Sequence, residues 1–178
     1  SFEFNFRQQT FIFATTETDK IFPPLKDRLT VVDFEPYTTE ELAEIIKICI
    51  PDINFSDDCI EEVAKTVRNN ARSAVKRSKE VSLYCGAKEK KSFNLDDFKD
   101  LSSQIGILPL GLTNTEKQVL VSLREIGAST LTSLSARIGL SKTALQRDHE
   151  MYLLNKNLME IDGKRKITSR GRQICQIL

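Results

Sequence analysis

The region that most constrains the fold is residues 109–178, where helical patterns are followed by a strand pair. Apolar residues recur at helical spacing in TEKQVLVSLREIG, STLTSLSARIG and SKTALQRDHEMYLLNKN. The stretch LMEIDGKRKITSRGRQI predicts a strand, a turn around Asp162 and Gly163, a basic strand and a short helical end. Three helices and a hairpin in this order predict a winged helix-turn-helix.

The turn in ARIGLSKTAL carries the helix-turn-helix signal. Ala136 is small where the helices should cross, Gly139 permits the turn, and Ser141 should cap the next helix. The helix that follows offers donors for phosphates and base edges: Ser141, Lys142, Thr143, Gln146 and Arg147. The acidic residues Asp148 and Glu150 make it less basic than a simple recognition helix, and a winged helix can also contact protein.

The predicted wing is cationic. Its basic side chains all fall between positions 164 and 172, and a cationic hairpin suits sequence-independent contact with phosphates. A basic surface turn can also serve solubility alone, but its occurrence beside a helix-turn-helix favours DNA contact. The predicted DNA-binding residues are Lys142, Arg147, Lys164, Arg165, Lys166, Arg170 and Arg172.

The N-terminal region predicts strands. Phe2, Phe4 and Phe6 alternate with polar residues, and Thr10–Ala14 and Leu29–Phe34 are short runs of strand-forming residues. A run buried on both faces suits a parallel sheet covered by helices, so residues 1–36 read as the end of a larger α/β domain.

Within this region, the stretch PPLKDRL places a run of charged residues directly after two prolines. Pro23 and Pro24 stiffen the chain and disfavour a regular helix through them, so the charges that follow should be held at a defined place after a strand. The charged run of Lys26, Asp27 and Arg28 therefore has the character of a presented cation.

The middle of the chain predicts a small bundle of four helices. Thr39 and Ser56 are candidate N-caps of the first two, the third covers roughly residues 71–87, and the fourth begins at a cap near Asn94. Gly106, Pro109 and Gly111 interrupt helix and predict a boundary. We therefore predict a mostly α chain with three parts: residues 1–36, a helical domain at 37–108 and a winged helix at 109–178.

Whole-chain charge does not point to a partner. The formal net charge is +1, from 26 basic and 25 acidic residues, so any site for a polyanion must be local. The chain shows neither a signal peptide nor an apolar run of roughly 18 residues, and we expect a cytoplasmic protein without membrane contact.

Cysteine and histidine usage gives little support to metal or nucleophilic chemistry. The four cysteines, Cys49, Cys59, Cys85 and Cys175, form no CxxC pair and stand among apolar residues, so we expect them to be buried. His149 is the only histidine and has no adjacent nucleophile, so we expect it to be structural and predict no metal site.

Two polar stretches suggest an anionic ligand. In ATTETD, Thr15, Thr16 and Thr18 follow a predicted strand end, where α/β proteins place polar groups towards ligands, although turn capping would account for them equally well. In NNARSAVKR, Arg72 stands at a helix start, where a cation opposes the helix dipole. That mismatch hints at an anionic partner.

Taken together, these pieces resemble the C-terminal part of the RuvB-type Holliday-junction branch-migration motor, an AAA+ ATPase. The matching order is FATT at a strand end, the PLKDR loop, a four-helix lid, the NARSA helix start, and a wing in YLLNKNLMEIDGKRKIT. The resemblance covers nearly the whole chain from Thr10 and implies the end of an AAA+ large subdomain, a lid and a winged helix.

The resemblance also implies roles for single residues. Thr16, with Thr15 beside it, would be the sensor-1 group, Arg28 the arginine finger that reaches the nucleotide of a neighbouring subunit, and Arg72 the sensor-2 residue. A planar multidentate cation suits the charge that spreads over the equatorial oxygens during phosphoryl transfer.

The same resemblance implies cofactors and partners. The complete protein would use ATP and Mg²⁺, form a homo-hexamer, act on the duplex arms of a four-way DNA junction, and bind a junction-recognition protein through a region upstream. The motif GxxxxGK[ST] does not occur in the 178 residues, and NNARS stands where the family has a GTPR-like start. We therefore expect this chain alone to hold no nucleotide productively.

Two alternatives stay open. One is an AAA+ relative with an initiation or loading role, and the other is a nucleotide-independent transcriptional regulator whose helical bundle binds a partner.

Overall fold

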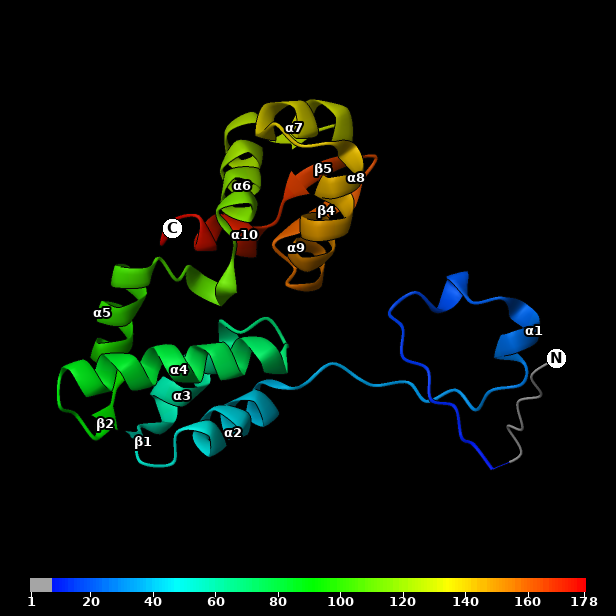
Figure 1. Cartoon of the computed structure of the whole chain (residues 1–178). Helices are drawn as coiled ribbons and strands as arrows, with labels where there is room; N and C mark the ends of the chain where they lie inside the picture. The colour runs from blue at the N-terminus through cyan, green and yellow to red at the C-terminus, as the bar shows by residue number, and fades with distance from the viewer. Residues whose placement is uncertain (1–7) are drawn as a thin grey trace. The chain divides into compact units, whose positions relative to one another are not determined.

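The structure, a computed structural model, describes residues 8–178. The chain divides into two compact units, Ser1–Glu35 and Pro36–Leu178. Helices account for most of the regular structure in the described residues, and the strands are short (Figure 1). The mostly α fold class predicted from the sequence is confirmed. No helix within residues 8–178 is long and apolar enough to cross a membrane.

The first unit contains two short helical turns, η1 (Thr18–Lys20) and α1 (Pro23–Lys26). The prediction that the two prolines exclude a helix is wrong, because both lie in the first turn of α1. The backbone N–H groups of a first turn have no partner within the helix, so proline loses nothing there.

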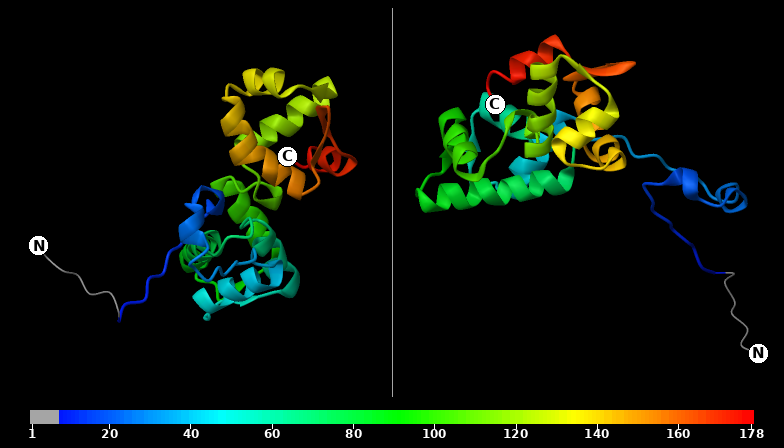
Figure 2. Two further views of the ribbon diagram at one scale, coloured as in Figure 1. Left: turned by 90° about the vertical axis from the view of Figure 1, so that its right-hand side faces the viewer. Right: turned by 90° about the horizontal axis from the view of Figure 1, so that it is seen from above.

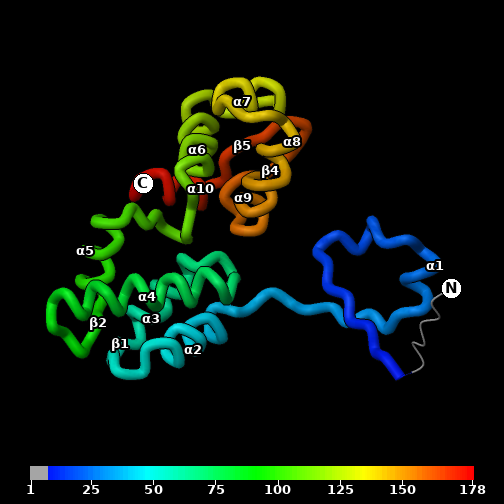
Figure 3. Tube along the Cα trace, in the orientation of Figure 1, coloured from blue at the N-terminus to red at the C-terminus, as the bar shows by residue number. Residues whose placement is uncertain are grey.

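The strands predicted in the first unit are absent from its described residues. Thr10–Ala14 and Leu29–Phe34 are irregular chain, and Figure 3 shows the path of this segment as a loop. A strand requires a neighbour to pair with its N–H and C=O groups, and neither range has one in residues 8–178. The strand predicted around Phe2, Phe4 and Phe6 lies outside the described residues.

Four helices begin the second unit, as predicted. They are α2 (Thr39–Cys49), α3 (Asp57–Lys65), α4 (Ala71–Ala87) and α5 (Leu95–Ile105), with α4 the longest (Figures 1 and 2). A parallel pair, β1 (Asn54–Phe55) and β2 (Ser92–Phe93), joins the loops that precede α3 and α5.

The caps explain where these helices begin. Asn94 caps α5 as predicted, in a reciprocal capping box with Asp97. Thr38 rather than Thr39 caps α2, because its hydroxyl oxygen is the one that accepts the N–H of Glu41. Ser56 occupies the N-cap position of α3, but its side chain accepts no capping hydrogen bond.

The bundle encloses an apolar core with an aromatic centre. Leu42, Ile46 and Val63 from α2 and α3 are at most 1% exposed, and Phe93 lies between them and the later helices. The ring of Phe93 meets that of Tyr84 edge to face at 5.7 Å between centroids.

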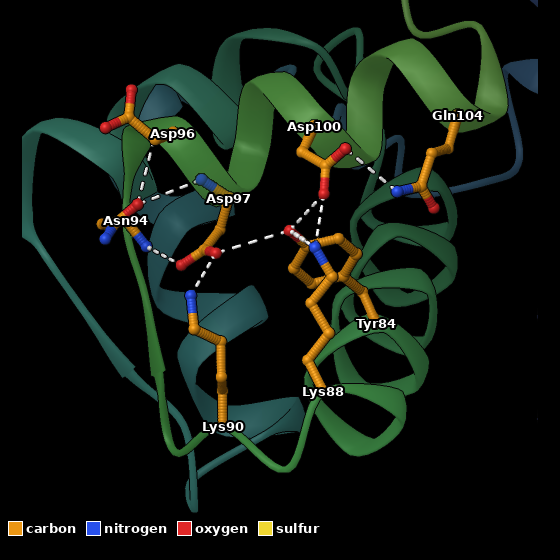
Figure 4. A network of polar contacts seen from close by, with 8 residues as sticks. All are labelled: Tyr84, Lys88, Lys90, Asn94, Asp96, Asp97, Asp100 and Gln104. Atoms are coloured by element: carbon orange, nitrogen blue, oxygen red, sulfur yellow. Dashed lines mark hydrogen bonds and ion pairs between the residues drawn. The ribbon is translucent and has the colours of Figure 1, made fainter.

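A network of polar contacts joins the end of α4 and the loop after it to α5 (Figure 4). Lys88 Nζ donates to Asp100 Oδ2 at 2.5 Å, and the Tyr84 hydroxyl donates to the same oxygen at 2.8 Å. Lys90 pairs with the buried Asp97, whose other oxygen accepts the backbone N–H of Asn94. These contacts fasten the loop after α4 to the first two turns of α5.

The rest of the second unit is the winged helix. Its elements are η2 (Pro109–Gly111), α6 (Asn114–Ile126), β3 (Ala128–Ser129), α7 (Leu131–Ile138), α8 (Lys142–Leu145), the π-helical η3 (Gln146–Glu150), α9 (Met151–Asn155), β4 (Met159–Asp162), β5 (Lys164–Ile167) and α10 (Ser169–Ile174). The hairpin β4–β5 was predicted, whereas β3 was not. Strand β3 pairs with β5 and completes an antiparallel sheet in the order β3-β5-β4.

A second apolar core lies under these elements, formed by leucines such as Leu123, Leu134 and Leu153. Leu134 and Ser135 of α7 face it, while Ala136 is exposed, so the predicted role of Ala136 at a helix crossing is wrong. Gly139 permits the turn as predicted: it ends α7 in the left-handed region, with φ +77°.

Three of the cysteines, Cys59, Cys85 and Cys175, are buried as predicted. Burial raises the pKa of the Cys59 thiol to about 12, so it stays protonated. The prediction is wrong for Cys49, which is exposed because α2 ends there and its side chain borders a surface groove with Val75 and Leu83.

Candidate nucleic-acid interface

The helical stretch that follows the turn at Gly139 consists of α8, η3 and α9, and it begins as predicted. Ser141 accepts the backbone N–H of Ala144 at 3.1 Å and so caps α8. Leu145 and Leu153 anchor the stretch in the apolar core, while Lys142, Thr143 and Gln146 are exposed. The sequence therefore buries one side of this element and leaves donors for an anion on the other.

The stretch is not regular α-helix throughout. The residues of η3 between α8 and α9 adopt a π-helical turn, which sequence periodicity did not reveal. A π turn adds a residue and shifts the following side chains around the axis, and such turns are frequent at functional sites. Glu150, the last residue of η3, lies on the buried side, where it is 3% exposed.

Arg147 lies on the exposed side, beside an acid. Its Nε and Nη2 donate to the two carboxylate oxygens of Asp148 at 2.6 and 3.0 Å. The hydrogen bonds from Arg147 lower the pKa of the Asp148 carboxyl, which stays ionised. The pair presents a guanidinium whose charge is largely balanced, in line with the acidic character noted for this helix.

The wing presents cations unequally. Gly163 turns the hairpin with φ +63°, and Lys164 next to it is exposed. Lys166 is half-buried and donates to Asp162 Oδ2 at 2.9 Å across the turn. Lys164 is therefore the cation of the hairpin best placed to meet an incoming phosphate.

Arg165 has a different environment from the other predicted DNA-binding residues. Its Nε and Nη2 donate to the two oxygens of Glu150 at 2.6 and 3.1 Å. The side chains are only 12% and 4% exposed. A bidentate pair of this burial holds the wing against the helical stretch and leaves little of the guanidinium for a ligand.

Sequence reasoning missed the part played by Glu150. The available signal was its spacing: Glu150 stands three residues before Leu153, which places it near the apolar side of a helix. A carboxylate at such a position requires a buried cationic partner, and the wing supplies it.

The last two predicted cations lie at α10. Arg170 and Arg172 are exposed and border a shallow depression with Asn157, Glu160 and Thr168. Gly171 between them is buried, because its backbone passes so close to Leu158 that an added Cβ would lie 2.1 Å from the Leu158 carbonyl oxygen. This contact holds the backbone of α10 close to the residue that precedes β4.

The residues assigned by resemblance to ATP chemistry are exposed, and they are divided between the two units. Thr16 and Arg28 lie in the first unit, where Arg28 Nη1 donates to the Pro24 carbonyl at 3.0 Å. Thr15, beside Thr16, accepts the N–H of Glu17 at 2.9 Å, which is the turn-capping alternative. Arg72 lies at the start of α4 in the second unit, where Asn70 caps its backbone N–H at 2.9 Å.

Each of the two arginines, in its own unit, suits contact with a phosphate anion. Arg28 and Arg72 each carry a planar multidentate cation. Across residues 8–178, no group of histidine, cysteine, aspartate or glutamate side chains could hold a metal ion. His149, on the buried side of η3, has Nδ1 3.5 Å from a carboxylate oxygen of Glu116, which fits the predicted structural role.

Comparison with known proteins confirms the resemblance to RuvB. The chain is 28% identical over 151 residues to the Holliday junction branch migration complex subunit RuvB of Thermotoga petrophila, covering 82% of this chain and 45% of that protein. It is 27% identical over 173 residues to RuvB of Thermotoga maritima, covering 94% and 50%. With RuvB of Mycoplasmopsis pulmonis the identity is 28% over 174 residues, covering 94% and 55%.

The fold gives the same result. The solved structure described as the Thermotoga maritima RuvB Holliday junction branch migration motor matches with a TM-score of 0.72 and 26% identity, over 86% of this chain and 54% of that one. No protein-family model matches the chain. The chain spans about half the length of the curated relatives that it matches.

Proposed function

We propose that this chain is the DNA-contacting and nucleotide-sensing part of an ATP-driven motor that moves Holliday junctions. The observation that carries the proposal is a set of exposed cations on a winged helix whose sequence and fold are similar to those of RuvB: Lys142, Lys164, Arg170 and Arg172. They come from the start of the helical stretch, the wing tip and α10, and no carboxylate is paired with any of them in the described contacts.

The proposed contact is with the DNA backbone rather than with bases. Flexible cations neutralise phosphates irrespective of sequence, whereas base readout requires several donors held in fixed positions in the major groove. Arg147 and Lys166 join this surface with weaker net charge because each has an acidic partner. Arg165 belongs to the proposed interface indirectly, since its pair with Glu150 positions the wing.

We assign the ATP-related roles by position. Thr16 would act as the sensor-1 polar group, Arg28 as an arginine finger acting on a neighbouring subunit, and Arg72 as sensor 2. ATP and Mg²⁺, when bound to the complete protein, supply the phosphoryl group and neutralise its charge. The proposed assembly is a cytoplasmic homo-hexamer on the duplex arms of a four-way junction, with a junction-recognition protein bound outside this segment.

A specific observation also favours protein contact as a second candidate function. Arg147, Arg165 and Lys166 each lie within 3.0 Å of an aspartate or glutamate, so three of the seven predicted DNA-binding cations are already paired. A winged helix with partly balanced charge suits a mixed-charge protein surface.

Binding of this chain to a four-way junction, a plain duplex and a single strand across a salt series separates the two candidates. We expect binding to the junction and duplex that is independent of sequence and falls steeply with salt. Lys164→Ala should weaken it equally on all duplex sequences and reduce the salt slope by about 0.9. Lys99→Ala, which changes an exposed lysine of α5, is the matched control and should have no effect. Absence of binding at low salt would favour protein contact.

The arginine-finger assignment requires the complete motor. Arg28→Ala should suppress ATP turnover by about a thousandfold while nucleotide binding is retained, because a finger acts on charge that develops in the transition state. Lys26→Ala, two residues earlier on the same exposed turn, is the matched control. Unchanged turnover in Arg28→Ala would remove the assignment.

A further inference from the structure

A buried carboxylate lies where the two apolar cores of the second unit approach each other. Glu116 stands in the first turn of α6 and is 0% exposed. One oxygen accepts the N–H of Thr113 at 2.8 Å, which completes a capping box. A carboxylate without solvent needs more than one backbone donor, so its remaining partners matter for the whole region.

The main partner of Glu116 comes from the other core. Arg68, in the turn between α3 and α4, donates from Nη2 and Nη1 to the two Glu116 oxygens at 2.9 and 3.3 Å. Its guanidinium also lies over the ring of Tyr152 in α9, 3.8 Å from the centroid. One side chain of the helical bundle therefore contacts both α6 and the helical stretch of the winged helix.

The backbone that presents Arg68 is strained. Arg68 and Asn69 have φ values of +57° and +56°, in the left-handed region that residues with a Cβ seldom adopt. Two such residues in succession persist only where the surroundings compensate for them, and such strain is often found at functional positions. The strain here turns the guanidinium away from its own bundle and towards α6.

Two further contacts join the same two parts, and a third holds Tyr152 in place within the winged helix. The Tyr152 hydroxyl donates to the carbonyl of Leu110 in η2, and burial raises the pKa of Tyr152 to about 12, so it remains a donor. Lys156 Nζ donates to Asn69 Oδ1 at 3.4 Å. The backbone of Gly111 passes so near the end of α3 that an added Cβ would lie 2.2 Å from the Thr66 carbonyl oxygen.

We propose that Arg68, Glu116 and Tyr152 form a latch that makes the helical bundle and the winged helix one rigid body. These are positioning residues: they contact neither a nucleotide nor DNA in the function proposed above. Their effect is that any displacement of the bundle is passed to the helical stretch carrying Lys142 and Arg147, because Tyr152 belongs to that stretch. Without the latch, the connection would depend on the short segment from Gly106 to Thr113 and on the hydrogen bond from Lys156 to Asn69.

The bundle contains a matched pair that lacks this property. Arg77 Nη1 lies 2.7 Å from Glu80 Oε2, and the two side chains are 15% and 25% exposed. This pair is buried to a degree comparable with Arg68 and Glu116. Both of its residues belong to α4, so their ion pair joins nothing to the winged helix. A change at Arg77 tests general destabilisation, and a change at Arg68 tests the latch.

The native cysteines make the test direct. Cys49 is exposed in the bundle, whereas the other three are buried, so a spin label attaches at Cys49 without further change. A second label at Gln118→Cys, on the exposed side of α6, reports the distance between the two parts by pulsed electron spin resonance. We expect one narrow distance distribution in this chain.

Arg68→Gln should broaden that distribution about twofold, since the contacts that hold the two parts would be lost while each core stays intact. Arg77→Gln should leave the width unchanged. Tyr152→Leu removes the ring over which the Arg68 guanidinium lies and should give an intermediate width, which keeps the test available if Arg68→Gln does not fold. An unchanged width in both Arg68→Gln and Tyr152→Leu would overturn the latch.

The latch and the proposed function can fail separately. Junction binding by Arg68→Gln should match that of the unchanged protein, because the exposed cations of the winged helix are untouched. If no variant binds DNA, the proposed function fails while the distance distributions still decide on the latch.

Discussion

The described part of Ser1–Glu35 and the segment Pro36–Leu178 use apolar residues in opposite ways. In the first, Ile12 and Phe34 are 91% and 92% exposed, whereas in the second Ile46 and Leu123 are 0% exposed. Both regions contain strongly apolar runs, so hydrophobicity alone does not account for the difference. What differs is whether the region contains the partners that its predicted secondary structure requires.

A helix satisfies most of its backbone hydrogen bonds internally, while a strand obtains them from another strand. The helices of the second segment therefore form and then bury their apolar sides against each other. The apolar runs of the first have no sheet to join within residues 8–178 and remain irregular. An apolar run in a sequence thus indicates that a segment must pack against another element, but it does not say where that element lies.

The largest expected effect tests this contrast with matched truncations. Leu123→Ala should lower the free energy of unfolding by about 3 kcal/mol, because it removes buried methyl groups and leaves a cavity in the second core. Val32→Ala, at a side chain 69% exposed, should change it by less than about 0.5 kcal/mol. Urea unfolding followed by circular dichroism gives both values.

A cost for Val32→Ala comparable with that of Leu123→Ala would break the comparison. It would mean that the first unit buries its valines in solution and has a core of its own.

A pair of glycines sharpens the comparison within the second segment. Gly111→Ala should destabilise by about 3 kcal/mol, since its φ is +67° and the new Cβ would collide with the Thr66 backbone. Gly139→Ala also has a positive φ, but nothing lies within 4 Å of the new atom, so it should cost about 1 kcal/mol. Thermal unfolding of both variants measures the difference.

Equal costs for the two glycine variants would mean that only backbone conformation matters at position 111. The close approach between the Gly111 backbone and the end of α3 would then contribute nothing to stability.

The smallest expected effect is a pH dependence located in the bundle. Hydrogen bonds from Lys88 and Tyr84 lower the pKa of Asp100 from 3.8 to about 2. Because the folded-state pKa is the lower one, the stabilisation is complete above about pH 4 and is lost as the pH falls towards 2. Urea midpoints measured from pH 5 to pH 2, as approximate limits, should fall less steeply in Asp100→Asn. Identical slopes would show that the Lys88 contact contributes nothing.

Much of the helical architecture could be predicted from local patterns. The apolar spacing, the cap at Asn94 and the turn at Gly139 act through residues within a few positions of each other, and they place α5 and α7 correctly. The wing hairpin followed from a turn glycine between two strand-forming runs. The errors at Pro23 and Thr39 are also local: the first missed the short helix α1, and the second moved a helix cap by one residue.

The candidate interface was less predictable, because charge in a sequence does not say which cations are paired. Arg165 and Lys164 are adjacent and carry the same charge, but Arg165 is paired with Glu150 whereas Lys164 is exposed. Comparing the two required knowing that Glu150 contacts the wing, which its spacing from Leu153 alone does not show.

The sequence by itself determined the four helices of the bundle, the caps at Asn94 and Ser141, and that a basic hairpin follows a helix-turn-helix. These features depend on neighbours in the chain and on the periods of backbone structure. Only the tertiary structure decided that Arg68 contacts Glu116, 48 positions away, and that Glu150 engages Arg165. Such pairs depend on how separate elements pack, and the burial that makes them important exists only after that packing has formed.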